Sequence, residues 1–126
     1  MDSQVKSFAI ASLRRASYRW PGRYKAFAAA KIGRNQYVCS HCSAIKGRKD
    51  VNLDHILPVV DPEIGWVSFD VFIERLFCSE NNFQVLCCDC HKKKTAVERE
   101  FRLAAKKKEK KELPIIKKRR KIIKKR

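Results

Sequence analysis

The sequence has no apolar segment that approaches the roughly 20 residues needed to cross a bilayer, and its acidic side chains are few. Its first residues, Met-Asp-Ser-Gln-Val-Lys, lack the charged-then-apolar order of a secretory signal. Thirteen Asp and Glu residues face 30 Lys and Arg residues, which gives a net charge of +17. This imbalance predicts a polyanionic partner, and nucleic acid fits it better than the alternative, an anionic membrane surface.

The positive charge is concentrated at the C-terminal end. Residues 106–126 contain 13 basic and two acidic residues and therefore carry +11 of the +17. We expect this tail, whether helical or disordered, to bind DNA phosphates without reading the base sequence. The alternatives are a solubilising extension and a helix that packs its isoleucines against the body. The candidate phosphate-binding residues in the tail are Lys117, Lys118, Arg119 and Arg120.

Four of the six cysteines form two C-x-x-C pairs, Cys39 with Cys42 and Cys87 with Cys90. Paired spacing in a Lys-rich chain favours metal thiolates in a reducing cytoplasm over the disulfides of a secreted protein. Four thiolates suit a tetrahedral, structural Zn²⁺ with no open position. Two other readings remain open: the thiols could be ordinary core residues, or His91 could replace Cys90 as the fourth ligand.

Other polar residues lie between and after the two pairs. Phosphodiester hydrolysis requires a deprotonated water and charge neutralisation on the phosphate. The neutral imidazole of His55 can accept the proton of the water. Asp54 and His91 can hold one divalent cation, which would stabilise the leaving oxygen. Because neighbours on a strand point to opposite faces, Asp54 and His55 need a local twist or flank the phosphate from different sides.

The apolar pattern predicts an α+β fold. We expect helices over residues 3–16 and 23–31, a β segment over residues 51–56, a strand over residues 83–86, and a helix over residues 90–111 that Pro114 ends. We expect Ser68 to cap a short helix. We also expect apolar side chains of the last helix to face the core. The residues expected to be buried are Phe69, Phe72, Ile73, Leu76 and Phe77 in the short helix, and Val97, Phe101 and Leu103 in the last helix.

The motifs together resemble the HNH nucleases, in their zinc-bound branch, over residues 37–95. The resemblance rests on the first C-x-x-C, on Leu-Asp-His-Ile-Leu-Pro at residues 53–58, and on Asn-Phe-Gln-Val-Leu-Cys-Cys-Asp-Cys-His-Lys-Lys-Lys-Thr at residues 82–95. It implies a ββα-metal core. It also implies three domains or extensions: N-terminal helices over residues 1–36, a nuclease core over residues 37–105, and a basic tail over residues 106–126.

The resemblance implies the same roles for the site residues. His55 would be the general base, and Asp54 and His91 would bind the catalytic cation, for which Mg²⁺, Mn²⁺ and Ni²⁺ are candidates. Asn82 would fix the loop that orients the base, although it could be only a turn residue. Thr95, one helical turn after His91, is a weak ligand, so water and phosphate would complete the coordination.

The implied activity is cleavage of DNA to 5′-phosphate and 3′-hydroxyl ends, and the expected partner is double-stranded DNA. Weak sequence preference is expected because the chain shows no helix-turn-helix, finger or arm beyond the core. Similar stand-alone proteins are encoded by bacteriophages, which makes a terminase or other packaging protein a candidate partner. The competing function is a non-catalytic, zinc-stabilised DNA-binding or packaging accessory protein, and RNA is an alternative substrate. Candidate phosphate contacts in the core are Arg48, Lys49, Lys92, Lys93 and Lys94.

Overall fold

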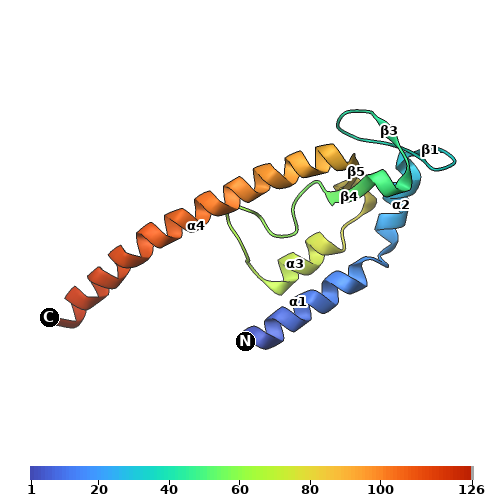
Figure 1. The fold of residues 1–126 in the computed structure, drawn as a ribbon. Helices are drawn as coiled ribbons and strands as arrows, with labels where there is room; N and C mark the ends of the chain where they lie inside the picture. The colour runs from blue at the N-terminus through green and yellow to red at the C-terminus, as the bar shows by residue number, and fades with distance from the viewer. Residues whose placement is uncertain (126) are drawn as a thin grey trace.

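Two helices open the chain and pack beside the strands and the third helix (Figure 1). The computed structural model describes the backbone of residues 1–125 and the side chains of residues 1–112. Helix α1 (Ser3–Ser17) follows Asp2, whose side chain accepts a hydrogen bond from the backbone N–H of Gln4. Helix α2 (Pro21–Ala30) starts with Pro21, where the missing N–H removes no intrahelical hydrogen bond.

A small antiparallel sheet follows, with strand order β1-β2-β3. Its strands are β1 (Lys31–Gly33), β2 (Gln36–Val38) and β3 (Ile45–Lys46). Asn35 and Ser43 have positive φ angles of 53° and 63°, the left-handed region in which a chain turns sharply. The sheet therefore holds the two tight loops on either side of β2.

The second sheet is an antiparallel pair of strands that contacts the last helix. β4 (Val51–His55) pairs antiparallel with β5 (Phe83–Cys87), so that Val51 lies opposite Cys87 and His55 opposite Phe83. Both strands lie where the sequence predicts them. Helix α4 (Cys88–Lys125) begins directly after β5 and contacts both strands. The chain is thus of the α+β class, as predicted.

The core lies between this strand pair and the helices α2 and α3. Val85 and Phe72 are almost completely buried, and Val51, Leu76 and Phe83 are also buried. Helix α3 (Phe69–Leu76) begins at Ser68, whose hydroxyl accepts a hydrogen bond from the N–H of Val71 at 3.2 Å, so the predicted cap is confirmed. The predicted burial of Ile73 is wrong, because its side chain is 40% exposed on the outer face of α3.

Two short 3₁₀ turns, η1 (Arg48–Asp50) and η2 (Glu80–Asn82), lead into β4 and β5 respectively. Each turn sets the direction in which its strand leaves the loop before it. η1 is tied to the first sheet, because the N–H of Arg48 donates to the side-chain oxygen of Asn35 at 3.0 Å. η2 comes directly before the strand partner of His55.

Helix α4 extends well beyond the rest of the chain (Figure 1). Its 38 residues correspond to a length of about 57 Å. The prediction that Pro114 ends this helix is wrong: the missing N–H removes one hydrogen bond from a long helix rich in Lys, Glu and Ala, and the helix continues. Inward packing of Val97, Phe101 and Leu103 is also wrong. Their exposed fractions are 51%, 46% and 50% respectively.

No helix in the described part of the chain is long and apolar enough to span a membrane. The side chains predicted to bind phosphate in the tail lie outside the side chains that the structure describes. These are Lys117, Lys118, Arg119 and Arg120.

Candidate functional site

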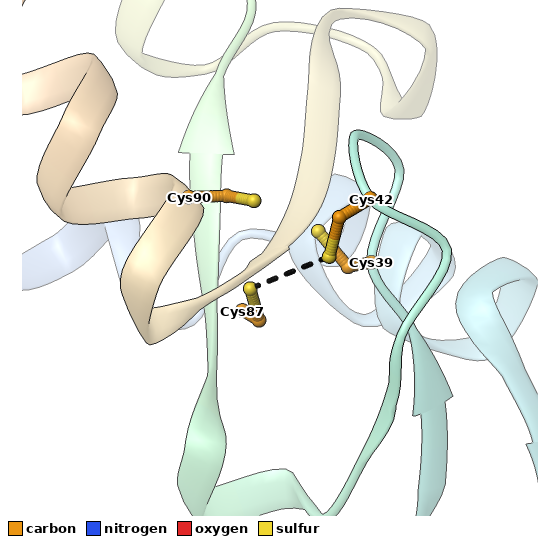
Figure 2. A group of neighbouring side chains, drawn as sticks. All are labelled: Cys39, Cys42, Cys87 and Cys90. Atoms are coloured by element: carbon orange, nitrogen blue, oxygen red, sulfur yellow. Dashed lines mark hydrogen bonds between the residues drawn. The ribbon is translucent and has the colours of Figure 1, made fainter.

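The four paired cysteines come together at one point, as predicted (Figure 2). Cys39 and Cys42 lie in the loop after β2, Cys87 ends β5, and Cys90 lies in the first turn of α4. Their sulfur atoms all lie within 4.8 Å of one another, and the Sγ atoms of Cys42 and Cys87 are 3.7 Å apart. A tetrahedral zinc with bonds of about 2.3 Å separates its sulfur ligands by about 3.8 Å. The four cysteines are therefore placed to hold a metal ion such as zinc.

Backbone hydrogen bonds shape the first cysteine loop. The N–H of Ser43 donates to the carbonyl of Cys39 at 3.0 Å, and the N–H of Cys39 donates to the carbonyl of Ala44 at 2.9 Å. The N–H of Ser40 donates to the carbonyl of Val85 at 2.9 Å. This last bond fastens the loop to β5, so the backbone holds the two cysteine pairs together.

The thiols differ in their tendency to ionise. Burial disfavours the thiolate of Cys39, but backbone N–H groups, first that of Cys42, lower its pKa to about 6. The pKa of Cys90 is raised to about 12, because its hydrogen bond with the Cys87 thiol and burial both favour the protonated form. The cluster thus accommodates one thiolate readily, and the ionisation of a further thiol is opposed. A divalent cation would remove that opposition, which fits the chemistry of this donor set.

Cys90, and not His91, completes the sulfur cluster. The side chain of His91 instead lines a cavity of about 320 Å³, together with His55. The structure therefore brings the two predicted histidines together, one from the end of β4 and one from the first turn of α4.

The cavity of His55 and His91 is also lined by three arginines. Arg14 comes from α1, Arg23 from α2 and Arg48 from η1. No acidic side chain lines the cavity. Among the side chains that the structure describes, no ion pair joins any of the three guanidinium groups to a carboxylate. We call this hollow the histidine cavity; its charge suits an anion such as a phosphate.

Each of the three guanidinium groups lies over an aromatic ring, and that of Arg14 lies 5.5 Å from the ring centre of Phe72. The guanidinium of Arg48 lies 3.9 Å from the ring centre of Phe27, and that of Arg23 lies 5.0 Å from the ring centre of Tyr18. Burial lowers the pKa of Arg23, and the nearby Arg48 lowers it further, while Tyr18 opposes the shift. Crowded guanidinium groups without a carboxylate partner gain most from an external anion.

His55 is held in a defined orientation. Its Nε2 atom lies 3.3 Å from the carbonyl oxygen of Leu76, and its ring packs against that of Phe83 with 4.7 Å between centres. A carbonyl can only accept, so Nε2 carries the proton and the lone pair lies on Nδ1. Burial is the largest effect on this imidazole and lowers its pKa, which the Leu76 carbonyl partly opposes. The ring is therefore neutral at physiological pH and can accept a proton.

Asn82 fixes the chain that leaves His55. Its side-chain oxygen accepts a hydrogen bond from the N–H of Leu57 at 3.1 Å, and its carbonyl accepts one from the N–H of Ile56 at 2.8 Å. Its side-chain nitrogen lies 3.5 Å from the carbonyl of Leu57. Asn82 thereby holds both residues that follow β4, Ile56 through its backbone carbonyl and Leu57 through its side chain, and it does more than form a turn.

Asp54 lies on the opposite face of β4 from His55 and does not line the histidine cavity. Its Oδ2 atom accepts hydrogen bonds from Gln84 at 3.0 Å and from the ammonium group of Lys94. Among the described residues, the sulfur cluster is the one group of three or more potential metal ligands within reach of a single ion. The alternation of a regular strand explains why Asp54 and His55 diverge.

Lys94 links α4 to β4. Its ammonium group also donates to the carbonyl of His55 at 2.7 Å and pairs with Glu98 at 3.1 Å. Partial burial acts to lower the pKa of Lys94, but the hydrogen bonds to Asp54 and Glu98 raise it. This lysine, a candidate phosphate contact from the sequence, has three protein partners in the structure.

The other candidate phosphate contacts are accessible. Lys49, Lys92 and Lys93 are exposed, and Arg48 is exposed at the rim of the histidine cavity. The hydroxyl of Thr95 donates to the carbonyl of His91 at 2.9 Å within its own helix.

Arg14 and Arg23 are absent from the residues singled out in the sequence. Their only sequence signal is the concentration of arginine in the first 23 residues, which cannot show that α1 and α2 fold over the end of β4.

Comparison of the chain with protein-family models, with curated proteins and with solved structures finds no match.

Proposed function

We propose that the protein is a metal-dependent endonuclease of the HNH type, with a zinc-stabilised ββα-metal core, that hydrolyses DNA phosphodiester bonds with weak sequence preference. The observation that carries this proposal is the histidine cavity, where His55 and His91 lie among three arginines. A neutral imidazole and several cations around one hollow are the groups that attack on a phosphate diester requires. The products would carry 5′-phosphate and 3′-hydroxyl ends.

Zinc in the sulfur cluster would have a structural role. Four cysteine ligands leave no coordination position for water or substrate. The cluster joins the loop after β2 to β5 and to the first turn of α4, which carries His91. Zinc would thereby fix the start of α4 relative to β4, on which His55 lies.

His55 would remove the proton from the attacking water. Donation from Nε2 to the carbonyl of Leu76 leaves Nδ1 as the proton acceptor. The low pKa keeps the ring in the neutral form, and Asn82 holds the backbone immediately after it. The imidazole is therefore oriented before the substrate binds, and this preorganisation would raise the rate of the reaction.

The three arginines would bind the phosphate group. A guanidinium can donate two parallel hydrogen bonds to phosphate oxygens, and this arrangement opposes the charge that develops during attack. Arg23 is half-buried, so its charge is less screened than that of a surface lysine. Lys49, Lys92, Lys93 and the basic tail would hold the flanking DNA.

His91 would bind the divalent cation from the histidine cavity, and Mg²⁺, Mn²⁺ and Ni²⁺ are candidates for this ion. Asp54, its second ligand by the family resemblance, lies on the opposite face of β4 and would have to leave Lys94 to reach the same ion. Among the described residues, neither the ring of His91 nor Oδ1 of Asp54 makes a hydrogen bond, so both can donate to an ion. The cation would supply Lewis-acid stabilisation of the leaving oxygen. Because Lys94 pairs with Oδ2 of Asp54, the affinity for this cation is expected to be low.

The proposal is tested by incubating supercoiled plasmid with the zinc-loaded protein and Mg²⁺, Mn²⁺ or Ni²⁺ in turn, with the zinc-loaded protein and no added ion as control. We expect nicked or linear DNA with at least one ion, none without an added ion, and ends that a DNA ligase can rejoin because they carry a 5′-phosphate. Intact plasmid with every ion would contradict the proposal.

The competing function is a zinc-stabilised DNA-binding or packaging accessory protein without catalysis. The pairing of Asp54 with Lys94 favours it, since a catalytic cation would have to share that carboxylate. A protein of this kind would bind plasmid as tightly as the proposed nuclease does, but it would leave the plasmid intact with every ion. A terminase or other packaging protein as partner rests on the family resemblance alone.

A further inference from the structure

A second cavity, of about 390 Å³, adjoins the histidine cavity and is lined mainly by aromatic and basic side chains. Its walls come from the end of α1, from α2, from β2 and from η1. The aromatic residues are Tyr18, Tyr24, Phe27 and Tyr37, and the basic ones are Arg23, Lys31 and Arg48. We call it the tyrosine cavity. No acidic side chain lines it.

The two cavities lie side by side and share four lining residues. Tyr18, Arg23, Phe27 and Arg48 line both of them. A ligand that reaches from His55 across Arg23 and Arg48 therefore enters the tyrosine cavity. The proposed reaction leaves this second space unused.

One ring in the tyrosine cavity has a free face. The side chain of Tyr24 is 63% exposed, and among the described residues no other ring packs against it. The other rings are engaged: Phe27 and Tyr37 meet edge to face with 6.1 Å between centres, and Arg23 lies over Tyr18. Tyr24 thus presents an unoccupied aromatic surface beside two guanidinium groups.

Aromatic surface next to cationic groups matches the chemistry of a nucleotide, which has a flat base and an anionic phosphate. A base inside a duplex is covered on both faces by its neighbours and cannot stack on a side chain. Only an unpaired base can use the ring of Tyr24. We propose that the tyrosine cavity binds an unpaired nucleotide next to the phosphate in the histidine cavity, so that the protein prefers single-stranded or locally opened DNA.

This inference rests on the proposed DNA-directed function and adds the strand state of the substrate. It is tested by binding, which does not depend on cutting. The His55→Ala protein is titrated into a fluorescent single-stranded oligonucleotide and into a blunt duplex of the same length, both at about 0.15 M salt. We expect the single strand to bind more tightly.

Variants of Tyr24 locate the effect. In the same protein, Tyr24→Ala should weaken single-strand binding about tenfold, the typical effect of losing one stacked base, and leave duplex binding within about twofold. Tyr24→Phe should retain single-strand binding because it keeps the ring. Phe8→Ala, which removes an exposed ring from α1, is the matched control and should change neither.

Equal loss of single-strand and duplex binding in Tyr24→Ala, or no loss of either, would overturn the inference. Competition by a deoxynucleoside monophosphate at the same concentration as the strand would also overturn it, since the cavity would then be a site for free nucleotides. If the unaltered protein cleaves plasmid but Tyr24→Ala does not weaken single-strand binding, this inference is removed and the nuclease proposal stays in place. If Tyr24→Ala weakens single-strand binding but the unaltered protein does not cleave plasmid, the nuclease proposal is removed and this inference stays in place.

Discussion

At the scale of single residues, His55 depends on groups that lie far from it in the sequence. Its ring contacts the carbonyl of Leu76 and the ring of Phe83, and the chain that leaves it is held by Asn82. Each contact restricts a different motion of the imidazole or of its backbone. The nitrogen that can accept a proton is therefore set by the surrounding structure.

Substitution of Asn82 by Ala tests this support. The variant loses hydrogen bonds to Leu57, which should cost about 1 kcal/mol of unfolding free energy, and DNA cleavage should slow by about tenfold or more because the base is held less firmly. Cleavage rate and urea unfolding are the measurements. Asn81→Ala, at the exposed neighbouring position, is the control. Equal cleavage rates in the two variants would show that Asn82 does not position His55.

The residue scale also shows what the sequence could predict. The grouping of four cysteines follows from their spacing, since each C-x-x-C pair is local and two pairs complete one tetrahedral site. The roles of Arg14 and Arg23 could not be predicted in this way. Their position at the histidine cavity depends on packing between α1, α2 and the end of β4, which no local pattern encodes.

At the scale of elements, Lys94 fastens α4 to β4. It pairs with Asp54, donates to the carbonyl of His55 and pairs with Glu98 within its own helix. Its side chain is 27% exposed and that of Asp54 is 16% exposed, so these contacts are partly shielded from water. They join β4, which carries His55, to α4, which carries His91.

Lys94→Ala should destabilise the protein by about 1–3 kcal/mol, because the half-buried carboxylate of Asp54 is left with Gln84 as its remaining partner. The measurement is the free energy of unfolding in urea. Lys93→Ala, which removes an exposed neighbour on the same helix, should change stability by less than about 0.5 kcal/mol. Equal effects in both variants would mean that Lys94 makes no special contribution.

The elements differ in how far their sequences determine them. The cap at Ser68 and the strands β4 and β5 follow local rules and lie where predicted. Helix α4 does not follow its apolar pattern, because Val97 and Phe101 are 51% and 46% exposed and line open surface cavities instead of the core. Burial depends on what lies opposite a residue, and the sequence of the helix alone does not contain that information.

At the scale of the whole molecule, the sulfur cluster joins the loop after β2, the end of β5 and the first turn of α4. Its buried cysteines form one small apolar cluster with Leu86. For a chain with this small a core, a metal that binds the folded state contributes folding free energy directly. The account therefore predicts that the fold depends on zinc.

Cys39→Ser should bind less than one zinc per chain and should melt at least about 10 °C lower than the unaltered protein. Zinc content and thermal unfolding followed by circular dichroism are the measurements. Cys78→Ser, which changes a cysteine outside the cluster, should retain zinc and melt close to the unaltered protein. Removal of zinc by a chelator should reproduce the effect of Cys39→Ser. An unchanged melting temperature in Cys39→Ser would contradict the structural role of the metal.

The most direct measurement of the central claim is the initial rate of plasmid cleavage by the unaltered protein and by His55→Ala, at equal zinc content and with the same catalytic ion. The account predicts a rate at least about 10² times lower for His55→Ala, with unchanged melting temperature and DNA affinity. Equal cleavage rates for the two proteins would contradict it, since the cutting would then not depend on the imidazole in the histidine cavity.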